Sequence, residues 1–180
     1  MFAGQMSCEA VNFLLKRWIK EERPRQMYGK GYGMPSSHAQ FVAFFSVSLT
    51  LFLLIRHAPS PSLTHTPFPI WQRGLLSIVA CLCAAAVALS RIYLSYHTPK
   101  QVLVGCAAGA ISAIVWFAIT SILRSYGWIE WALDTKLAEM LRFRDLVITE
   151  DLVDAGWGRW VDRKKAQKRS INSGAKRKTP

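Results

Sequence analysis

The chain has 180 residues, of which 51% are hydrophobic and 19% are charged. This composition excludes disorder over most of the chain, and apolar runs of membrane-spanning length argue against an ordinary soluble domain. Lys and Arg outnumber Asp and Glu by 23 to 11, a net charge of +12 that here favours anionic lipid over nucleic acid as a partner. No acidic residue occurs from Arg23 to Ile129. A carboxylate cage for Mg²⁺ or Ca²⁺ cannot be built from that part of the chain, and we expect neither a metal nor a cofactor.

Four stretches predict helices, and together they predict an all-α fold, a polytopic transmembrane helix bundle. Phe2 to Ile19 comes first and is the weakest, because it carries Glu9 and Asn12, and we expect it to face other helices. Three cleaner runs approach the roughly 20 apolar residues that a bilayer core requires. They lie at 39–55, 74–94 and 102–123. The last run contains small residues, Gly105 and Gly109 among them, as expected where helices pack closely in lipid.

The character of the chain changes after Arg124. Residues 128–146 interleave Trp and Leu with charges, an amphipathic pattern that predicts a segment on the membrane surface. Residues 163–180 carry eight Lys or Arg and no acid, which predicts a disordered tail in contact with anionic lipid. We therefore divide the chain into a membrane core at 1–124, an amphipathic surface segment at 125–162 and a basic tail at 163–180.

Three polar clusters flank the predicted spans, at 16–24, 35–38 and 90–97. If consecutive helices cross the membrane in opposite directions, all three clusters meet at one face, while the 56–73 connector and the tail fall on the other. A count of basic residues leans weakly toward a cytosolic tail. The basic residues on the face with the clusters need a separate explanation, and an anionic substrate would supply one.

Two of these clusters also have a simple structural interpretation as helix starts. Ser37 with Gln40, and Thr98 with Gln101, each match the spacing of a capping box, and Pro99 suits a first helical position. The functional interpretation begins from the same pattern, because two helix N-termini directed at one place form an anion site.

The charged and imidazole side chains strengthen the functional interpretation. His38 and His97 each lie beside a predicted helix start on the same face. Lys16, Arg23 and Arg91 would be interface anchors on the simpler view, since long cationic side chains reach toward the membrane surface. Three cations that converge on two helix starts instead resemble a clamp for phosphate.

In this order, the residues resemble the three-part signature of the type-2 phosphatidate phosphatase superfamily, which includes the vanadium haloperoxidases. The matching segments are Lys16 with Arg23-Pro24, then Pro35-Ser36-Ser37-His38, then Ser90-Arg91 with His97 and Gln101. Ser37 stands where Gly is usual, and Gln101 where Asp is usual. Within the superfamily, residues 32–38 and 90–98 are similar to the dolichyldiphosphatase group, in which Gln at the last position is also typical.

The resemblance implies a metal-independent phosphatase with a phosphatase/haloperoxidase-like helical core. His97 would be the nucleophile that forms a phosphohistidine, and His38 the general acid. The residues implied in phosphate binding are Lys16, Arg23, Ser36, Ser37 and Arg91. Gln101 would orient His97 through its carbonyl oxygen, or would only cap its helix. We expect no nearby carboxylate to replace the missing Asp.

The implied reaction is hydrolysis of dolichyl diphosphate to dolichyl phosphate and phosphate, which recycles the lipid carrier for protein N-glycosylation. It implies a multi-pass protein of the endoplasmic reticulum membrane, with a lumenal active site and a cytosolic tail. The last five residues, 176–180, also resemble a cytosolic retrieval signal. Two alternatives remain open: a phosphatase of phosphatidate or another lipid phosphate, and a non-catalytic membrane protein that binds anionic lipid. Members of the superfamily usually have helices before the first motif, and we expect this chain to lack them.

Overall fold

A computed structural model describes residues 1–24, 31–57, 69–143, 156 and 159–167. The ordered elements are α1 (Phe2–Ile19), α2 (Ser37–Leu51) with its π-helical continuation η1 (Phe52–Arg56), α3 (Ile70–Tyr93), α4 (Pro99–Ser125), α5 (Trp128–Leu133) and α6 (Lys136–Met140). Residues 159–167 are also helical, apart from these elements. No strand occurs in these ranges, which confirms the predicted all-α fold.

Within the described part of the chain, three helices are long and apolar enough to cross a membrane: Ser37–Arg56, Ile70–Tyr93 and Pro99–Ser125. Two of them contain the predicted runs 39–55 and 102–123, and the third covers the run 74–94 except for Leu94, which follows its last residue. α1 is a helix with the predicted bounds, but it is not among the helices that are long and apolar enough to cross a membrane. Asn12 on α1 is buried, whereas Glu9 is exposed. The expectation that this helix faces other helices is confirmed, because α1 packs against α2 and α4.

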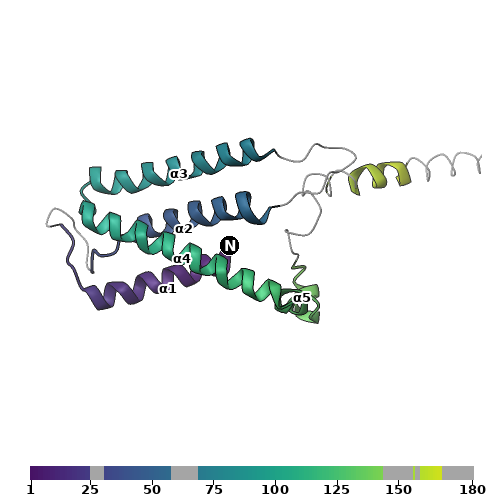
Figure 1. Cartoon of the computed structure of the whole chain (residues 1–180), viewed down its shortest axis with the longest axis horizontal. Helices are drawn as coiled ribbons and strands as arrows, with labels where there is room; N and C mark the ends of the chain where they lie inside the picture. The colour runs from purple at the N-terminus through teal and green to yellow at the C-terminus, as the bar shows by residue number, and fades with distance from the viewer. Residues whose placement is uncertain (25–30, 58–68, 144–155, 157–158, 168–180) are drawn as a thin grey trace, which may run out of the picture. The chain divides into compact units, whose positions relative to one another are not determined.

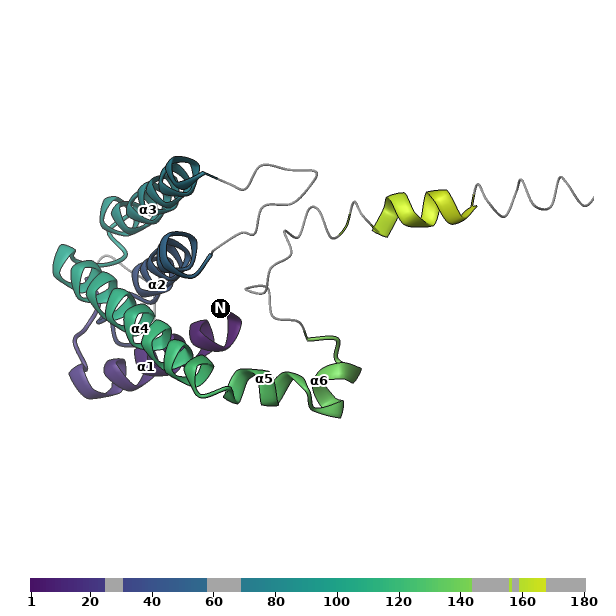
Figure 2. The ribbon, with the colours of Figure 1, turned by 45° about the vertical axis from the view of Figure 1, so that its right-hand side comes forward.

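The bundle is built around α2, which packs against α1, α3 and α4 (Figures 1 and 2). Helix α4 approaches α2 through glycines: a Cβ atom on Gly105 would lie 2.7 Å from the main-chain oxygen of Ser36, and one on Gly109 only 2.2 Å from that of Gln40. Such separations are shorter than real Cβ contacts, so only glycine permits this packing. The prediction of close packing at the small residues of this run is confirmed.

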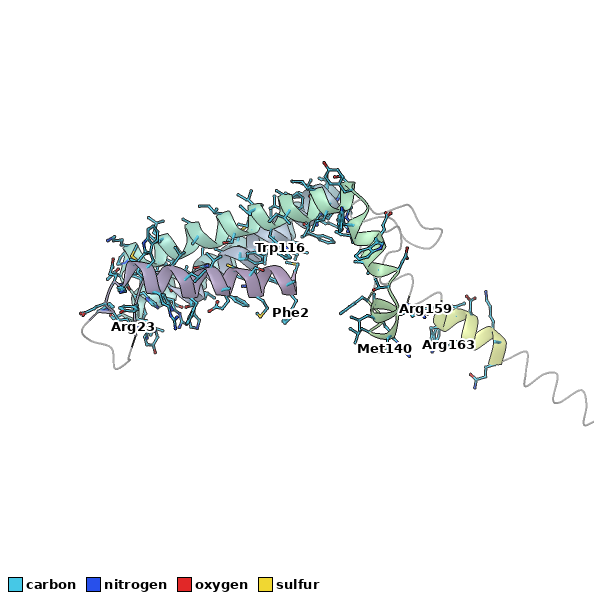
Figure 3. The ribbon with its side chains drawn as sticks, turned by 90° about the horizontal axis from the view of Figure 1, so that it is seen from below. Phe2, Arg23, Trp116, Met140, Arg159 and Arg163 are labelled. Atoms are coloured by element: carbon cyan, nitrogen blue, oxygen red, sulfur yellow. The ribbon has the colours of Figure 1, made fainter. Side chains whose placement is uncertain are left out.

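Helix α1 packs across α2 and α4 with its C-terminal end toward the site described below. At the opposite end, a Cβ on Gly4 would lie 2.6 Å from Nε1 of Trp116 in α4. Figure 3 shows Phe2 and Arg23 at the two ends of this segment. Gly4 therefore allows α1 to pack closely against α4. The residues that follow Ile19 lie beside the turn between α3 and α4 and the start of α4.

The chain divides into two compact units, one formed by Met1–Arg56 with Pro69–Phe143, and the other by His57–Phe68 with Arg144–Pro180. The first unit includes α5 and α6 and so extends beyond the predicted core at 1–124. The amphipathic segment predicted at 128–146 forms two short helices with a break at 134–135, and its last three residues lie outside the described ranges. The helix at 159–167 contains the first residues of the predicted tail, and the rest of that tail also lies outside those ranges.

Candidate active site

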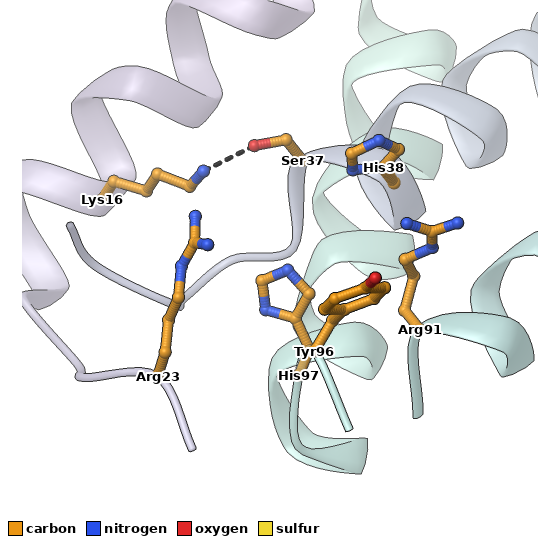
Figure 4. Close-up of a pocket in the computed structure, with 7 residues that line it drawn as sticks. All are labelled: Lys16, Arg23, Ser37, His38, Arg91, Tyr96 and His97. Carbon is orange, nitrogen blue, oxygen red and sulfur yellow. Dashed lines mark hydrogen bonds between the residues drawn. The ribbon is translucent and has the colours of Figure 1, made fainter. Parts of the chain in front are cut away.

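A pocket of about 250 Å³ opens where the end of α1, the start of α2 and the end of α3 meet. Figure 4 shows its seven lining side chains directed toward a common space. They are Lys16, Arg23, Ser37, His38, Arg91, Tyr96 and His97. Six of the eight site residues proposed from the sequence thus meet in one place, although they come from three separate segments. Ser36 and Gln101 do not line the pocket.

The turn after α3 explains the spacing between Arg91 and His97. The main-chain oxygen of Arg91 accepts hydrogen bonds from the N–H groups of Tyr96 (3.0 Å) and His97 (3.2 Å). Ser95 has a φ of 56°, in the left-handed region, which lets the chain turn back on itself. After this turn, His97 comes directly before Thr98, the N-cap of α4. Both the guanidinium of Arg91 and the imidazole of His97 therefore reach the same pocket.

Tyr96 is a lining residue that the sequence reasoning missed. The guanidinium carbon of Arg91 lies 5.4 Å from the centre of the Tyr96 ring, within the range of a cation–π contact. Nε of Arg91 also donates to the hydroxyl of Ser90 at 3.3 Å. An aromatic residue directly before His97 was the available signal, because it shares the turn that holds Arg91 to His97.

A hydrogen-bonded chain leads from the pocket into the core between α1 and α2. Nζ of Lys16 donates to Oγ of Ser37 at 2.5 Å, and that hydroxyl donates to Oδ1 of Asn12 at 3.0 Å. Nδ2 of Asn12 donates to Oε1 of Gln40 at 2.7 Å, and Nε2 of Gln40 donates to the main-chain oxygen of Cys8 at 2.9 Å. The chain orients both the Lys16 ammonium and the Ser37 hydroxyl at the wall of the pocket.

The predicted capping box at Ser37 and Gln40 is wrong. The residue that caps α2 is Ser36, its side chain makes no capping hydrogen bond, and Gln40 is engaged with α1 instead. Ser36 is fully buried, and its Oγ has no hydrogen-bond partner among the described residues. The N–H of Ser37 belongs to the first turn of α2, where main-chain donors have no partner within the helix.

Arg23 supplies the clearest sign that the pocket takes an anion. Its Nε is buried and has no acceptor among the described residues. A buried donor of this kind is costly unless it is satisfied by a hydrogen bond. Lys16 and Arg91 lie around the same space, and no Asp or Glu is among the lining residues. The pocket therefore carries an excess of positive charge that suits phosphate oxygens.

Gln101 makes the contacts of both interpretations between which the sequence left a choice. Its N–H donates to Oγ1 of Thr98 and its Oε1 accepts from the N–H of Thr98, each at 3.2 Å, which confirms the predicted capping box. The same Oε1 lies 3.2 Å from Nδ1 of His97. In addition, Nε2 of Gln101 donates to Oε1 of Glu21 at 3.1 Å. No nearby carboxylate was expected to replace the missing Asp, yet Glu21 lies one hydrogen bond away from the residue that contacts His97.

The surroundings of His97 favour its neutral form. Burial lowers the pKa of His97 most, and the positive charges of Arg23 and Lys16 lower it further. The hydrogen bond with Gln101 and a main-chain hydrogen bond with Gly33 act in the opposite direction. A neutral imidazole keeps a lone pair, which makes it a potential nucleophile at neutral pH. Within the described ranges, no group of three or more His, Cys, Asp or Glu side chains could hold a metal ion.

Comparison with known proteins gives a consistent result. The sequence model of the PAP2 superfamily matches residues 5–124, which include every pocket residue. A Neurospora crassa protein named "Putative dolichyldiphosphatase" is 42% identical over 93% of this chain and 77% of its own length. Saccharomyces cerevisiae dolichyldiphosphatase is 30% identical over 97% of the chain and 72% of its own length, and human dolichyldiphosphatase 1 is 44% identical over 62% of the chain. The matched region is about half of the human protein, at 48%.

A solved structure shares the fold. The crystal structure of a transmembrane PAP2-type phosphatidylglycerolphosphate phosphatase from Bacillus subtilis superposes with a TM-score of 0.55 and 23% sequence identity. The match covers 68% of this chain and 58% of the bacterial one. At this identity the likeness supports the helical architecture alone.

Proposed function

The chain belongs to the PAP2 superfamily, and from that premise we propose that it hydrolyses dolichyl diphosphate to dolichyl phosphate and phosphate. The observation that carries the proposal is the convergence of three cations and two imidazoles in one pocket at the end of membrane-length helices. The choice of substrate rests on the names of the Neurospora, yeast and human relatives. The activity would serve to recycle a lipid carrier used in protein glycosylation.

In the proposed mechanism, Nε2 of His97 attacks the terminal phosphorus of the diphosphate. A phosphorus–nitrogen bond forms while the bond to the bridging oxygen breaks, and His38 protonates the departing dolichyl phosphate. Water then attacks the phosphohistidine, with His38 accepting its proton, and phosphate leaves. Lys16, Arg23 and Arg91 hold the non-bridging oxygens, on which negative charge must be stabilised during phosphoryl transfer. No step requires a metal ion.

The position of the pocket suits a lipid substrate. It lies at the start of α2 and the end of α3, where two membrane-length helices reach the edge of the bundle. A polyprenyl chain would remain among the exposed apolar side chains of these helices, while its headgroup reaches the pocket. We place the protein in the endoplasmic reticulum membrane, with the pocket on the lumenal side and the C-terminal tail in the cytosol.

The proposal is tested with purified protein in detergent micelles, in a buffer that contains a metal chelator. Phosphate release is measured with dolichyl diphosphate and, separately, with phosphatidate. We expect release from dolichyl diphosphate, little from phosphatidate, and loss of activity in His97→Ala. His57→Ala is the matched control, because His57 lies outside the pocket. Full activity in His97→Ala would refute the mechanism, and equal activity on both lipids would favour the broader lipid-phosphate phosphatase.

A further inference from the structure

The side-chain amide of Gln101 uses all of its hydrogen-bonding capacity. Nε2 donates one hydrogen to Oε1 of Glu21 at 3.1 Å and the other to the main-chain oxygen of Glu22 at 2.9 Å. Oε1 accepts from the N–H of Thr98 and faces Nδ1 of His97, each at 3.2 Å. A primary amide has two donor hydrogens and two acceptor lone pairs. Every one of them is therefore matched.

This saturation fixes which way the amide points. If the amide were reversed, its NH₂ would face the N–H of Thr98, and its oxygen would face the Glu22 carbonyl and the Glu21 carboxylate. Each of these contacts would set donor against donor or acceptor against acceptor. The oxygen must therefore face His97, so the proton of the neutral imidazole belongs on Nδ1. The lone pair is then on Nε2, the atom to which the proposed mechanism assigns the attack.

Glu21 is itself held in place. Nζ of Lys100 contacts its Oε2 at 3.2 Å, and its main-chain oxygen accepts from the N–H of Gly33 at 2.7 Å. A Cβ atom on Gly33 would lie only 2.9 Å from Nε2 of Gln101, so the chain closes tightly over the amide. Hydrogen bonds from Gln101 and Lys100 hold the pKa of Glu21 below its ordinary value. The side chain thus stays charged at neutral pH.

We propose that Glu21 is a positioning residue for His97 and acts through Gln101. Glu21 fixes the amide so that its oxygen selects the Nδ1-protonated tautomer of His97, and its charge polarises that amide toward the imidazole. A carboxylate thus takes part in the site indirectly, through the amide of Gln101. The inference rests on the proposed role of His97 as nucleophile.

Glu22 provides a matched control. It is adjacent to Glu21 and carries the same charge, but its side chain is exposed and it reaches Gln101 only through its main-chain oxygen. Glu22→Ala therefore removes one negative charge next to Glu21 and keeps the hydrogen bond from Gln101 to the main-chain oxygen of residue 22. Glu21→Ala removes both the charge and the acceptor. Glu21→Gln keeps an acceptor oxygen and removes only the charge.

Two readouts are combined on the full chain in micelles. Nitrogen-15 NMR of histidine-labelled protein reports the tautomer of His97, assigned by comparison with His97→Ala, and steady-state phosphate release reports kcat and KM. In Glu21→Ala we expect loss of the single Nδ1-protonated form and a fall in kcat of about 10- to 100-fold, the size found when a partner that orients a functional histidine is removed. KM should change little. Glu22→Ala should match the wild type in both readouts.

Glu21→Gln gives a second reading that does not depend on how Glu21→Ala folds. It should keep the Nδ1-protonated form and lose less kcat than Glu21→Ala. A wild-type tautomer in Glu21→Ala, wild-type kcat in that variant, or equal losses in Glu22→Ala would each overturn the inference. If the wild type releases no phosphate, the proposed function fails instead, and the NMR comparison still decides whether Glu21 sets the tautomer.

Discussion

Replacing Gly109 in α4 by alanine is expected to destabilise the bundle and to slow the reaction. The added Cβ would lie 2.2 Å from the main-chain oxygen of Gln40 and 3.0 Å from Cβ of Ala43 in α2. Main-chain atoms cannot rotate away, so the two helices must move apart locally by roughly 1 Å in a tightly packed interface. Overpacking of this kind costs about 1–3 kcal/mol. Because Gln40 lies two residues beyond His38, the displacement should also lower kcat.

The comparison variant is Gly74→Ala in α3. No heavy atom lies within 4 Å of the Cβ that it would add, and alanine is favoured over glycine in a helix interior by about 0.5–1 kcal/mol. Thermal unfolding in detergent, followed by tryptophan fluorescence, should place Gly109→Ala about 2–12 °C below the wild type, at about 2–4 °C per kcal/mol for a chain of this size. Gly74→Ala should match or exceed the wild type. Equal unfolding temperatures for the two variants would refute the reasoning from helix contact.

Four further outcomes are expected. The acid limb of kcat/KM should have an apparent pKa below about 6.5, the ordinary value for histidine, because the pKa of His97 is lowered. His97 then stays neutral as the pH falls to about 6.5, and activity is lost only at lower pH. An acid limb centred above about 6.5 would contradict this. Asn12→Ala should lower the free energy of unfolding by about 1–3 kcal/mol, since it leaves the buried Oε1 of Gln40 without its donor, and no change in unfolding temperature would count against it. Arg91→Lys should lower kcat by about 10²–10³, the cost of losing one transition-state donor. Tyr96→Phe should stay near wild type and Tyr96→Ala should not, because the ring carries the contact with Arg91; equal kcat values for the two would exclude that role.

The convergence of the pocket residues could be predicted from the sequence because it follows from length and connection. Consecutive membrane-length runs that alternate in direction bring the clusters at 35–38 and 90–97 to one end of the bundle. The cluster at 16–24 joins them because a short connection links it to the start of α2. The turn that brings His97 close to Arg91 involves only a few consecutive residues, so the spacing of the two residues in the sequence is enough to predict their proximity. Local patterns were less reliable where tertiary contacts compete. Ser37 and Gln40 have the spacing of a capping box, but both side chains bond to Asn12 on another helix.

The contact between Glu21 and Gln101 could not be predicted, since 80 residues separate the two along the chain. The acidic gap in the sequence was correctly observed, but it describes position along the chain and not distance in space. The residues that follow α1 pack against the start of α4, and a hydrogen bond from the N–H of Gly33 to the main-chain oxygen of Glu21 keeps these residues in place. Neither periodicity nor motif spacing predicts that return, and so the carboxylate was assigned no role.

The amide between Glu21 and His97 has a physical consequence for the chemistry. A carboxylate in direct contact with the imidazole would raise the pKa of His97 and favour the charged form, which cannot attack phosphorus. Burial and the positive charges of Arg23 and Lys16 lower that pKa instead. Gln101 delivers the orientation that a carboxylate would provide while it keeps the negative charge one residue away from the ring. In the proposed mechanism, the site can therefore hold His97 in one tautomer and keep it neutral, while Lys16, Arg23 and Arg91 bind the phosphate oxygens.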